Sequence, residues 1–165
     1  MSFGNHSITK QTFDLIKEIL PSDKIILELG SGYGTEALAN YGYKLYSVEH
    51  NKGWMWKYNS NYIHCPLTNQ ESKSEFDQWY DIDSIISELP KEYDLLLVDG
   101  PPSDFRRTNF IHHLTKFNKK AIWVFDDLQR EYDLITYKKV CEARNLKEDI
   151  RDCGQKLVGL CIEEN

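Results

Sequence analysis

Hydrophobic residues along this chain come in short, nearly continuous runs that are separated by longer stretches with helical spacing. The runs occupy residues 24–29, 44–48, 61–64, 93–98, 121–125 and 157–162, and the one at 61–64 is the weakest. Short apolar runs of this kind are typical of strands that are buried on both faces of a parallel sheet. The pattern therefore predicts a sheet with both faces covered.

The segments between these runs place apolar residues three or four positions apart, which is the spacing of an amphipathic helix. Pro21, Gly42 and Pro90 mark where three of these helices end. The five apolar faces are Phe13, Ile16 and Leu20; Ala37, Leu38 and Tyr41; Ile82, Ile85, Ile86 and Leu89; Phe110, Leu114 and Phe117; and Leu134, Tyr137 and Cys141. Alternating strands and helices predict an α/β fold with a doubly wound, Rossmann-like sheet.

The C-terminal end breaks this alternation. Residues 148–153 and 157–162 are separated only by a turn that contains Gly154, which predicts an antiparallel hairpin. We expect a mostly parallel, seven-stranded sheet that ends in this hairpin. The polar stretch 68–78 is expected to be a surface loop or a short helix, and with no linker or repeat, residues 1–165 are expected to form one domain.

Composition narrows the class of protein. A net charge of -6 argues against a surface that binds nucleic acid or anionic lipid, because such a surface needs a basic face. The 4 cysteines form no C-x-x-C pair, so a zinc ribbon is not expected. No apolar stretch approaches the roughly 20 residues of a membrane helix, and the N-terminus does not resemble a signal peptide. We expect a cytoplasmic protein with reduced thiols.

A glycine-rich turn, Glu28-Leu-Gly-Ser-Gly-Tyr-Gly34, follows the first predicted strand and opens a helix. Glycine there lets the backbone approach a ligand closely, and the helix N-terminus offers free N–H groups. The dinucleotide pattern G-x-G-x-x-G would place a small residue at Thr35, which fits poorly. The next strand ends in Glu49, whose carboxylate can accept hydrogen bonds from two ribose hydroxyls. The alternatives are a purely structural turn and a solvated acid.

The segments ILELGSGYGTEAL and LYSVEH resemble the first two motifs of the class I S-adenosylmethionine-dependent methyltransferases. The resemblance extends from Lys24 to the C-terminus and includes the terminal hairpin. It implies that Glu28 supports the loop and that Glu49 holds the cofactor ribose. It also implies a wider set of cofactor-binding residues, namely Gly30, Ser31, Gly32, Gly34, His50, Cys65 and Asp99. His64 and Cys65 would flank the adenine, whereas for Trp54 base contact and core packing stay open.

Acidic residues follow two more strands, as Asp99 and as the pair Asp126-Asp127. Carboxyl ends of parallel strands meet at one edge of the sheet, so three carboxylates are expected there together. They would repel one another unless a cation or a shared proton intervenes, and oxygen ligands suit Mg²⁺ or a similar divalent ion. The placement resembles metal-dependent O-methyltransferases of the catechol and sugar types, although the catechol type usually carries Asp-Asn at the pair.

Two interpretations of these acids stay open. In one, the three aspartates hold a metal that lowers the pKa of an acceptor hydroxyl, and Asp99 or His64 takes its proton. In the other, Asp99 alone faces the sulfonium and the acid pair caps the next helix. The nearby Arg106, Arg107 and Arg130 are interpreted as solvated helix charges, with recognition of an anionic substrate as the alternative.

Together these features predict methyl transfer from S-adenosylmethionine to an oxygen of a small or saccharide-like acceptor. The chain is short for such an enzyme, so the acceptor site would be open or completed by another subunit of an oligomer. Two alternatives remain: a catalytically silent cofactor-binding partner subunit, and a nicotinamide-dependent oxidoreductase. The Gly-x-Gly-x-Gly spacing and the terminal hairpin disfavour the oxidoreductase.

Overall fold

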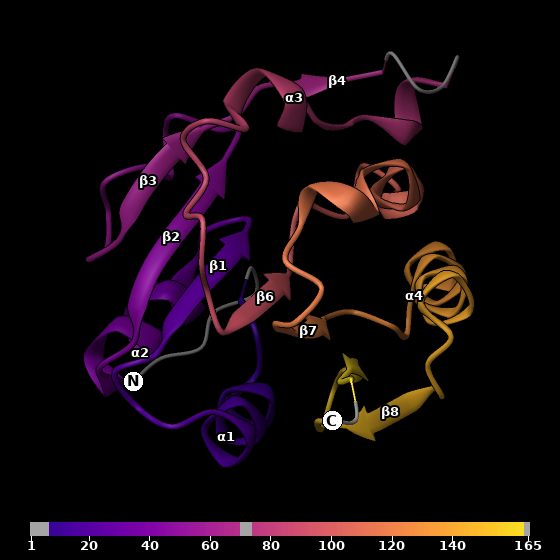
Figure 1. Ribbon diagram of the computed structural model, residues 1–165. Coiled ribbons are helices and arrows are strands. Elements are labelled where there is room, and N and C mark those ends of the chain that lie inside the picture. Colours follow the sequence, from indigo (N-terminus) through magenta and orange to yellow (C-terminus); the bar gives the residue numbers. More distant parts are fainter. Residues whose placement is uncertain (1–6, 70–73, 164–165) are drawn as a thin grey trace.

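Seven strands form one twisted sheet in the order β3-β2-β1-β6-β7-β9-β8 (Figure 1). The computed structural model describes residues 7–69 and 74–163. The strands are β1 (Ile25–Leu29), β2 (Lys44–Glu49), β3 (Asn61–His64), β6 (Leu95–Val98), β7 (Ile122–Phe125), β8 (Asp149–Asp152) and β9 (Leu157–Cys161). All but the last two are parallel neighbours, and β9 runs antiparallel to both β7 and β8. The predicted mixed sheet and terminal hairpin are confirmed.

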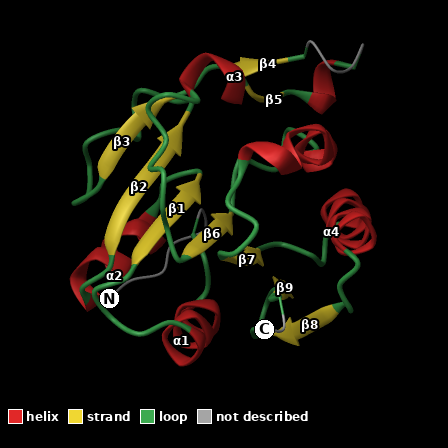
Figure 2. Ribbon diagram, viewed as in Figure 1, coloured by secondary structure: helices red, strands yellow, loops and turns green. Residues whose placement is uncertain are grey.

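Helices cover both faces of this sheet (Figure 2). The helices α1 (Lys10–Ile19) and α2 (Tyr33–Tyr41) lie on one face. On the other face are α3 (Ile82–Ile85), the 3-10 helix η2 (Arg107–Lys116) and α4 (Glu131–Arg144). Alternate strand residues serve the two layers: Ile26 packs with the first group and Leu27 with the second. This two-sided burial explains the continuous apolar runs.

The order in which strands are added to the sheet reverses at β1. β2 and β3 lie on one side of β1, and β6 lies on the other. Leu29 at the end of β1 is in register with Val48 of β2 and with Val98 of β6. The loops that follow these three strands therefore leave the sheet at one place. Open α/β sheets bind ligands at such a switch point, beyond the carboxyl ends of the strands.

One predicted α-helix has a different geometry. The segment around Phe110 and Leu114 forms the 3-10 helix η2, where Arg107, Asn109, Phe110 and His113 are buried. Three of these, Arg107, Phe110 and His113, are three positions apart, which matches the 3.0 residues per turn of a 3-10 helix. An apolar spacing of three to four residues is compatible with either helix type, so sequence alone did not distinguish them.

The described part of the polar stretch 68–78 contains a short helix, which is one of the two predicted possibilities. The 3-10 helix η1 (Glu75–Asp77) precedes β5 (Trp79–Tyr80), which pairs antiparallel with β4 (Leu67–Thr68). Residues 70–73 lie outside the described part of the chain. Across residues 7–69 and 74–163, the structure contains no helix with the length and apolarity that a membrane crossing requires. A cytoplasmic location stays a prediction.

Candidate active site

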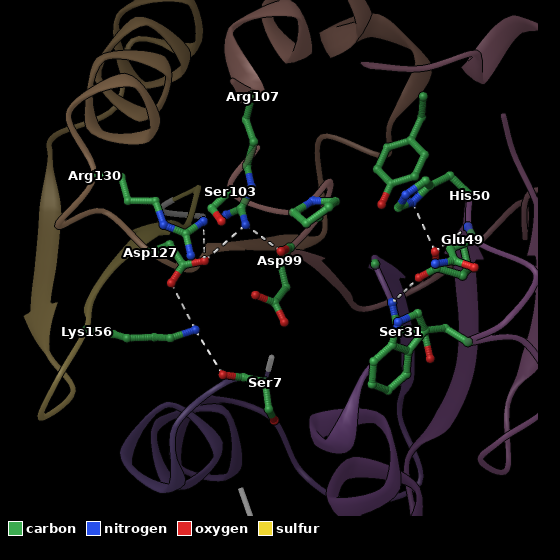
Figure 3. A pocket seen from close by; sticks show the side chains of 16 residues that line it. Ser7, Ser31, Glu49, His50, Asp99, Ser103, Arg107, Asp127, Arg130 and Lys156 are labelled. Carbon is green, nitrogen blue, oxygen red and sulfur yellow. Dashed lines mark hydrogen bonds and ion pairs between the residues drawn. The ribbon is translucent and has the colours of Figure 1, made fainter. Parts of the chain in front are cut away.

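A cavity of about 260 Å³ opens at the carboxyl ends of β1, β2, β6 and β7 (Figure 3). Its wall combines the glycine loop, the end of β2, the loops after β6 and β7, and the terminal hairpin. The lining residues are Ser7, Gly30, Ser31, Glu49, His50, Asn51, Trp54, Tyr80, Asp99, Gly100, Pro102, Ser103, Arg107, Asp127, Arg130 and Lys156. The cavity therefore lies where an open α/β sheet places its ligand.

Gly30 begins the turn after β1 and requires the absence of a side chain. Its φ is +93°, and a Cβ atom there would lie 2.9 Å from the Cα and N atoms of Gly100. Its amide donates to the carbonyl of Val48 at 2.8 Å. The loop backbone thus packs directly on the loop after β6, and both face the cavity.

Glu49 is held from three directions at the end of β2. The amides of Ser31 and Asn51 donate to its carboxylate at 2.9 and 2.7 Å, and Nδ1 of His50 lies 3.0 Å from Oε1. The side chain is almost completely buried. Burial raises the pKa of Glu49, but the contacts with His50, Asn51 and Ser31 outweigh it, so the pKa is lowered. Glu49 is therefore an ionised acceptor in the cavity wall.

Glu28 lies beneath the glycine loop. Its carboxylate accepts hydrogen bonds from the hydroxyls of Thr35 at 2.7 Å and Ser47 at 2.5 Å. Complete burial raises the pKa of Glu28 to about 8 despite these two donors. Thr35 also accepts from the amide of Gly32 at 3.0 Å. Glu28 thus supports the loop through Thr35.

The glycines of the loop serve different purposes. Gly32 caps the N-terminus of α2. A Cβ on Gly34 would lie 2.7 Å from Cγ1 of Ile8, so this glycine makes room for the N-terminal segment. Within the described chain, the cavity wall includes Gly30 and Ser31 but not Glu28, Gly32 or Gly34. The sequence motif therefore combines ligand-facing and packing residues.

Some of the residues expected around an adenine line the cavity and others do not. His50 and Trp54 line the cavity, whereas His64 and Cys65 are not in its wall as far as the structure is described. Nε2 of His64 lies 3.2 Å from the carbonyl of His50. Cys65 is fully buried, its amide donates to the Glu49 carbonyl at 3.0 Å, and burial raises its pKa to about 12. The roles assigned to His64 and Cys65 stay predictions.

The three strand-end aspartates do come together. One carboxylate oxygen from each of Asp99, Asp126 and Asp127 lies within 4.8 Å of the others. Asp126 is completely buried and Asp127 nearly so, whereas Asp99 is half-buried in the cavity wall. In Figure 3 the Asp99 side chain lies between Asp127 and the Ser31–Glu49 contact.

Cations surround the acid pair. Nζ of Lys156 lies 2.5 Å from Asp126 Oδ2 and 2.9 Å from Asp127 Oδ1, and it donates to the carbonyl of Ser7 at 2.9 Å. Arg130 lies 2.9 Å from Asp127 Oδ2. Burial raises the pKa of Asp127, but Arg107, Lys156 and Arg130 outweigh it and the pKa is lowered. Burial lowers the pKa of Lys156, yet the three aspartates raise it overall.

Arg107 is not the solvated helix charge that the sequence suggested. Its side chain is 3% exposed. It donates to the carbonyls of Asp99 at 2.5 Å and Asp126 at 2.9 Å, and to the Asp127 carboxylate at 3.1 Å. Arg106, in contrast, is 37% exposed and stacks over Tyr132 at 4.0 Å. The sequence identifies Arg107 as a cation, but no pattern in it indicates that this side chain is buried.

Two further cavity residues were missed. Lys156 directly precedes β9, and an antiparallel strand begins at the edge where its parallel neighbours end, so the predicted hairpin already implied this placement. Tyr80 is fully buried and lines the cavity, and its hydroxyl has no hydrogen-bond partner among the described residues. No pattern in the sequence distinguished Tyr80 from a core aromatic.

No protein-family model and no curated protein matches this sequence. Solved structures do match the fold. The ribosomal protein L11 methylase of Lactobacillus delbrueckii subsp. bulgaricus has a TM-score of 0.63 at 14% identity, over 97% of this chain and 80% of the methylase. A putative caffeoyl-CoA O-methyltransferase from Staphylococcus aureus has a TM-score of 0.65 at 12% identity, over 93% and 83%. MycE, a methyltransferase of mycinamycin biosynthesis solved with Mg and SAH, has 0.50 at 15%, over 90% and 44%.

The fold is that of the class I methyltransferases. At these identities the likeness concerns the fold alone. The names of the three neighbours mention a ribosomal protein, caffeoyl-CoA and the mycinamycin biosynthetic pathway, so they do not indicate one acceptor. The chemistry of this chain has to be inferred from its own cavity residues.

Proposed function

We propose that this protein is an S-adenosylmethionine-dependent methyltransferase that methylates an oxygen of a small or saccharide-like acceptor. The observation that carries the proposal is Glu49. It is a buried, ionised carboxylate in the cavity wall that contacts the glycine loop directly, because it accepts a hydrogen bond from the Ser31 amide. A buried charge is costly unless it is paired or serves a ligand, and a ribose diol would use its remaining lone pairs.

The cavity residues fit such a cofactor. Gly30 has no Cβ, so the glycine loop packs directly on Gly100 of the loop after β6, and both residues line the cavity. The Tyr80 hydroxyl is a buried donor for which the described chain supplies no partner, so a ligand can satisfy it. Burial keeps the pKa of Tyr80 well above its usual value, so the hydroxyl stays protonated. When bound, the cofactor supplies an electrophilic methyl group on a sulfonium.

Asp99 is the acid best placed for the acceptor. It lines the cavity between Ser31 of the glycine loop and Asp127. In the described chain, no side chain donates a hydrogen bond to its carboxylate, so Asp99 can accept one from an acceptor hydroxyl. A carboxylate at this position orients the oxygen and takes its proton as the methyl group moves. His64 is not in the cavity wall as far as the structure is described, so its role as a base stays a prediction.

Two alternatives differ from this proposal in specific features. The nicotinamide oxidoreductase is disfavoured by the sheet, because in the dinucleotide-binding order 3-2-1-4-5-6 the sixth strand lies beside the fifth and no reversed strand is inserted. Here antiparallel β9 separates β7 from β8. A silent partner subunit would keep the Glu49 site and need no free carboxylate at Asp99. The proposal also includes an acceptor other than nucleic acid. It further includes an oligomeric assembly of this protein.

The test is transfer of a radiolabelled methyl group from S-adenosylmethionine to a panel of hydroxylated acceptors, including monosaccharides and polysaccharide ends. We expect turnover on at least one oxygen acceptor. Asp99→Asn removes the proton acceptor, so its turnover should fall by a factor of about 100 or more, with unchanged S-adenosylhomocysteine binding. Cofactor binding without turnover on any acceptor would instead support the silent subunit. Reduction of a nicotinamide would contradict the proposal altogether.

A further inference from the structure

We propose that Lys156 occupies the place of the divalent cation in the Asp99–Asp126–Asp127 cluster, and that this protein methylates its acceptor without a metal. The inference deepens the proposed methyl transfer and rests on it for its catalytic meaning. The place of Lys156 in the cluster does not depend on the proposed methyl transfer. An ammonium group of the chain itself closes a carboxylate cluster that would otherwise bind Mg²⁺ or Mn²⁺.

Three carboxylates converging within 4.8 Å are a donor set that suits a hard cation. A bound metal ion would be coordinated by the carboxylate oxygens at the centre of such a cluster. Here Nζ of Lys156 already lies against Asp126 Oδ2 at 2.5 Å and Asp127 Oδ1 at 2.9 Å. An ion bound by these two oxygens would have to displace that ammonium. Arg107 and Arg130 take the second oxygen of Asp127. Asp126 Oδ1 is thus the one oxygen of the acid pair that the described chain leaves without a hydrogen-bond partner. The residues present therefore do not fit a resident metal.

The Lys156 ammonium makes two hydrogen bonds and one ion pair with the chain itself. An ammonium group has three N–H donors. Three acceptors lie within 2.9 Å of it, and the third is the main-chain carbonyl of Ser7. Lys156 thus ties the acid pair to the N-terminal segment, as the dashed lines of Figure 3 show in part. With no donor left for a substrate, Lys156 is a positioning residue.

Charge balance gives the same result. Four acids lie in this network, because Asp133 faces Arg107 and Arg130 at 3.9 and 3.7 Å. They face three cations, which are Lys156, Arg107 and Arg130. The three cations offset all but one of the four negative charges, so little net charge is left in this largely buried region to attract a divalent ion. Without a metal in the cluster, the Asp99 side chain is left to face the acceptor.

The position of Lys156 follows from the topology. β9 is antiparallel to β7, so it begins at the edge where β7 ends in the acid pair. A tight turn precedes β9, closed by the hydrogen bond from the Cys153 amide to the Lys156 carbonyl at 2.8 Å. The turn places Lys156 beside the loop that follows β7, and its long side chain reaches the carboxylates of that loop from there. The predicted metal site therefore lies within reach of a cation on the same chain.

Mn²⁺ titration of the purified full chain, followed by electron paramagnetic resonance, tests this without cofactor or acceptor. We expect no site tighter than about millimolar in the wild type. Lys156→Met removes the ammonium, and we expect its Mn²⁺ affinity to rise at least tenfold. Adding Asp99→Asn to Lys156→Met should reverse that gain. Lys138→Met, an exposed lysine paired with Glu148 outside the cluster, is the control and should leave Mn²⁺ binding unchanged.

A micromolar Mn²⁺ site in the wild type that Asp99→Asn abolishes would overturn the proposal, and this arm does not depend on the folding of a lysine variant. A folded Lys156→Met protein with no gain in Mn²⁺ affinity would also overturn it. S-adenosylhomocysteine binding is measured separately in the same samples. Loss of that binding would count against the proposed function, whereas the Mn²⁺ result alone decides the role of Lys156.

Discussion

The amide of Ser31 donates a hydrogen bond to Oε2 of Glu49 at 2.9 Å, and this contact joins the two sequence motifs on which the interpretation of the chain depends. One partner belongs to the turn after β1 and the other to the end of β2. The bond orients a buried carboxylate toward the cavity and lowers its pKa together with His50 and Asn51. The ligand site is therefore formed by two adjacent strand ends.

Replacing Gly30 with alanine should disturb both the fold and the cavity. Gly30 has a φ of +93°, and a Cβ atom would meet Gly100 at 2.9 Å. Gly42→Ala is the matched control, since its φ is +115° but the nearest atom to an added Cβ is 3.8 Å away. Both variants should lose about 1–3 kcal/mol from the strained backbone alone. Only Gly30→Ala should also weaken S-adenosylhomocysteine binding; equal binding by the two variants would contradict the close approach.

Glu28 should make stability depend on pH. Its pKa of about 8 in the folded protein, against an ordinary value of 4.5, means that folding favours the protonated form. The stabilisation is fully present below about pH 4.5 and is lost as the pH rises to about 8. At roughly 1.4 kcal/mol per pKa unit, the loss is a few kcal/mol at most.

Glu28→Gln is neutral at every pH and lacks this loss. Urea unfolding at pH 5.5 and at pH 8.5 should therefore show the free energy of unfolding of the variant rising relative to the wild type with pH. The comparison between the two proteins cancels the other titrating groups. A difference that stays constant, or one that falls between the two pH values, would mean that Glu28 is ionised in the folded state.

Two neighbouring arginines should differ sharply. Arg107→Met removes a buried guanidinium that binds three groups at the ends of β6 and β7, and it leaves Asp127 with one cation fewer. Breaking a buried ion pair in this way costs about 3–5 kcal/mol. Arg106→Met removes an exposed stacking contact and should cost about 1 kcal/mol or less. Chemical denaturation measures both, and similar losses would contradict the burial of Arg107.

Tyr80 should affect ligand binding rather than folding. Its buried hydroxyl has no partner in the described part of the chain, so Tyr80→Phe should leave the free energy of unfolding unchanged or raise it. Loss of one neutral hydrogen bond should weaken cofactor or acceptor binding about 2- to 10-fold. Tyr93→Phe is the opposite case, since its hydroxyl accepts from the Asn118 amide at 2.7 Å and its loss should destabilise the protein. Destabilisation by Tyr80→Phe would refute this assignment.

The sequence predicted the strands and their direction because burial on both faces leaves a direct trace in the apolar runs. It also predicted Gly30 and Glu49, since a close backbone approach and a strand-end acid each require particular residue types. The 3-10 geometry of η2 and the burial of Arg107 depend on long-range contacts that leave no local pattern. Gly34 shows the same limit: its neighbour is Ile8, 26 residues earlier in the chain.

The acid cluster shows which contacts local sequence patterns predict and which they do not. Asp99, Asp126 and Asp127 were correctly expected to meet, because parallel strand ends share one edge. Their cations were not foreseen, because Lys156 approaches from the reversed strand and Arg107 from a 3-10 helix. The metal site stays a prediction of the sequence, and the described cluster also contains the cations Lys156, Arg107 and Arg130.

Calorimetric titration with S-adenosylhomocysteine of the wild type, Glu49→Gln and the exposed control Glu36→Gln tests the central claim most directly. A hydrogen bond to a charged group contributes about 1.5–3 kcal/mol, so Glu49→Gln should weaken binding by about 10- to 100-fold. We expect micromolar affinity for the wild type and for Glu36→Gln. Equal affinity of all three proteins, or no binding by the wild type, would contradict the assignment of this cavity to the cofactor.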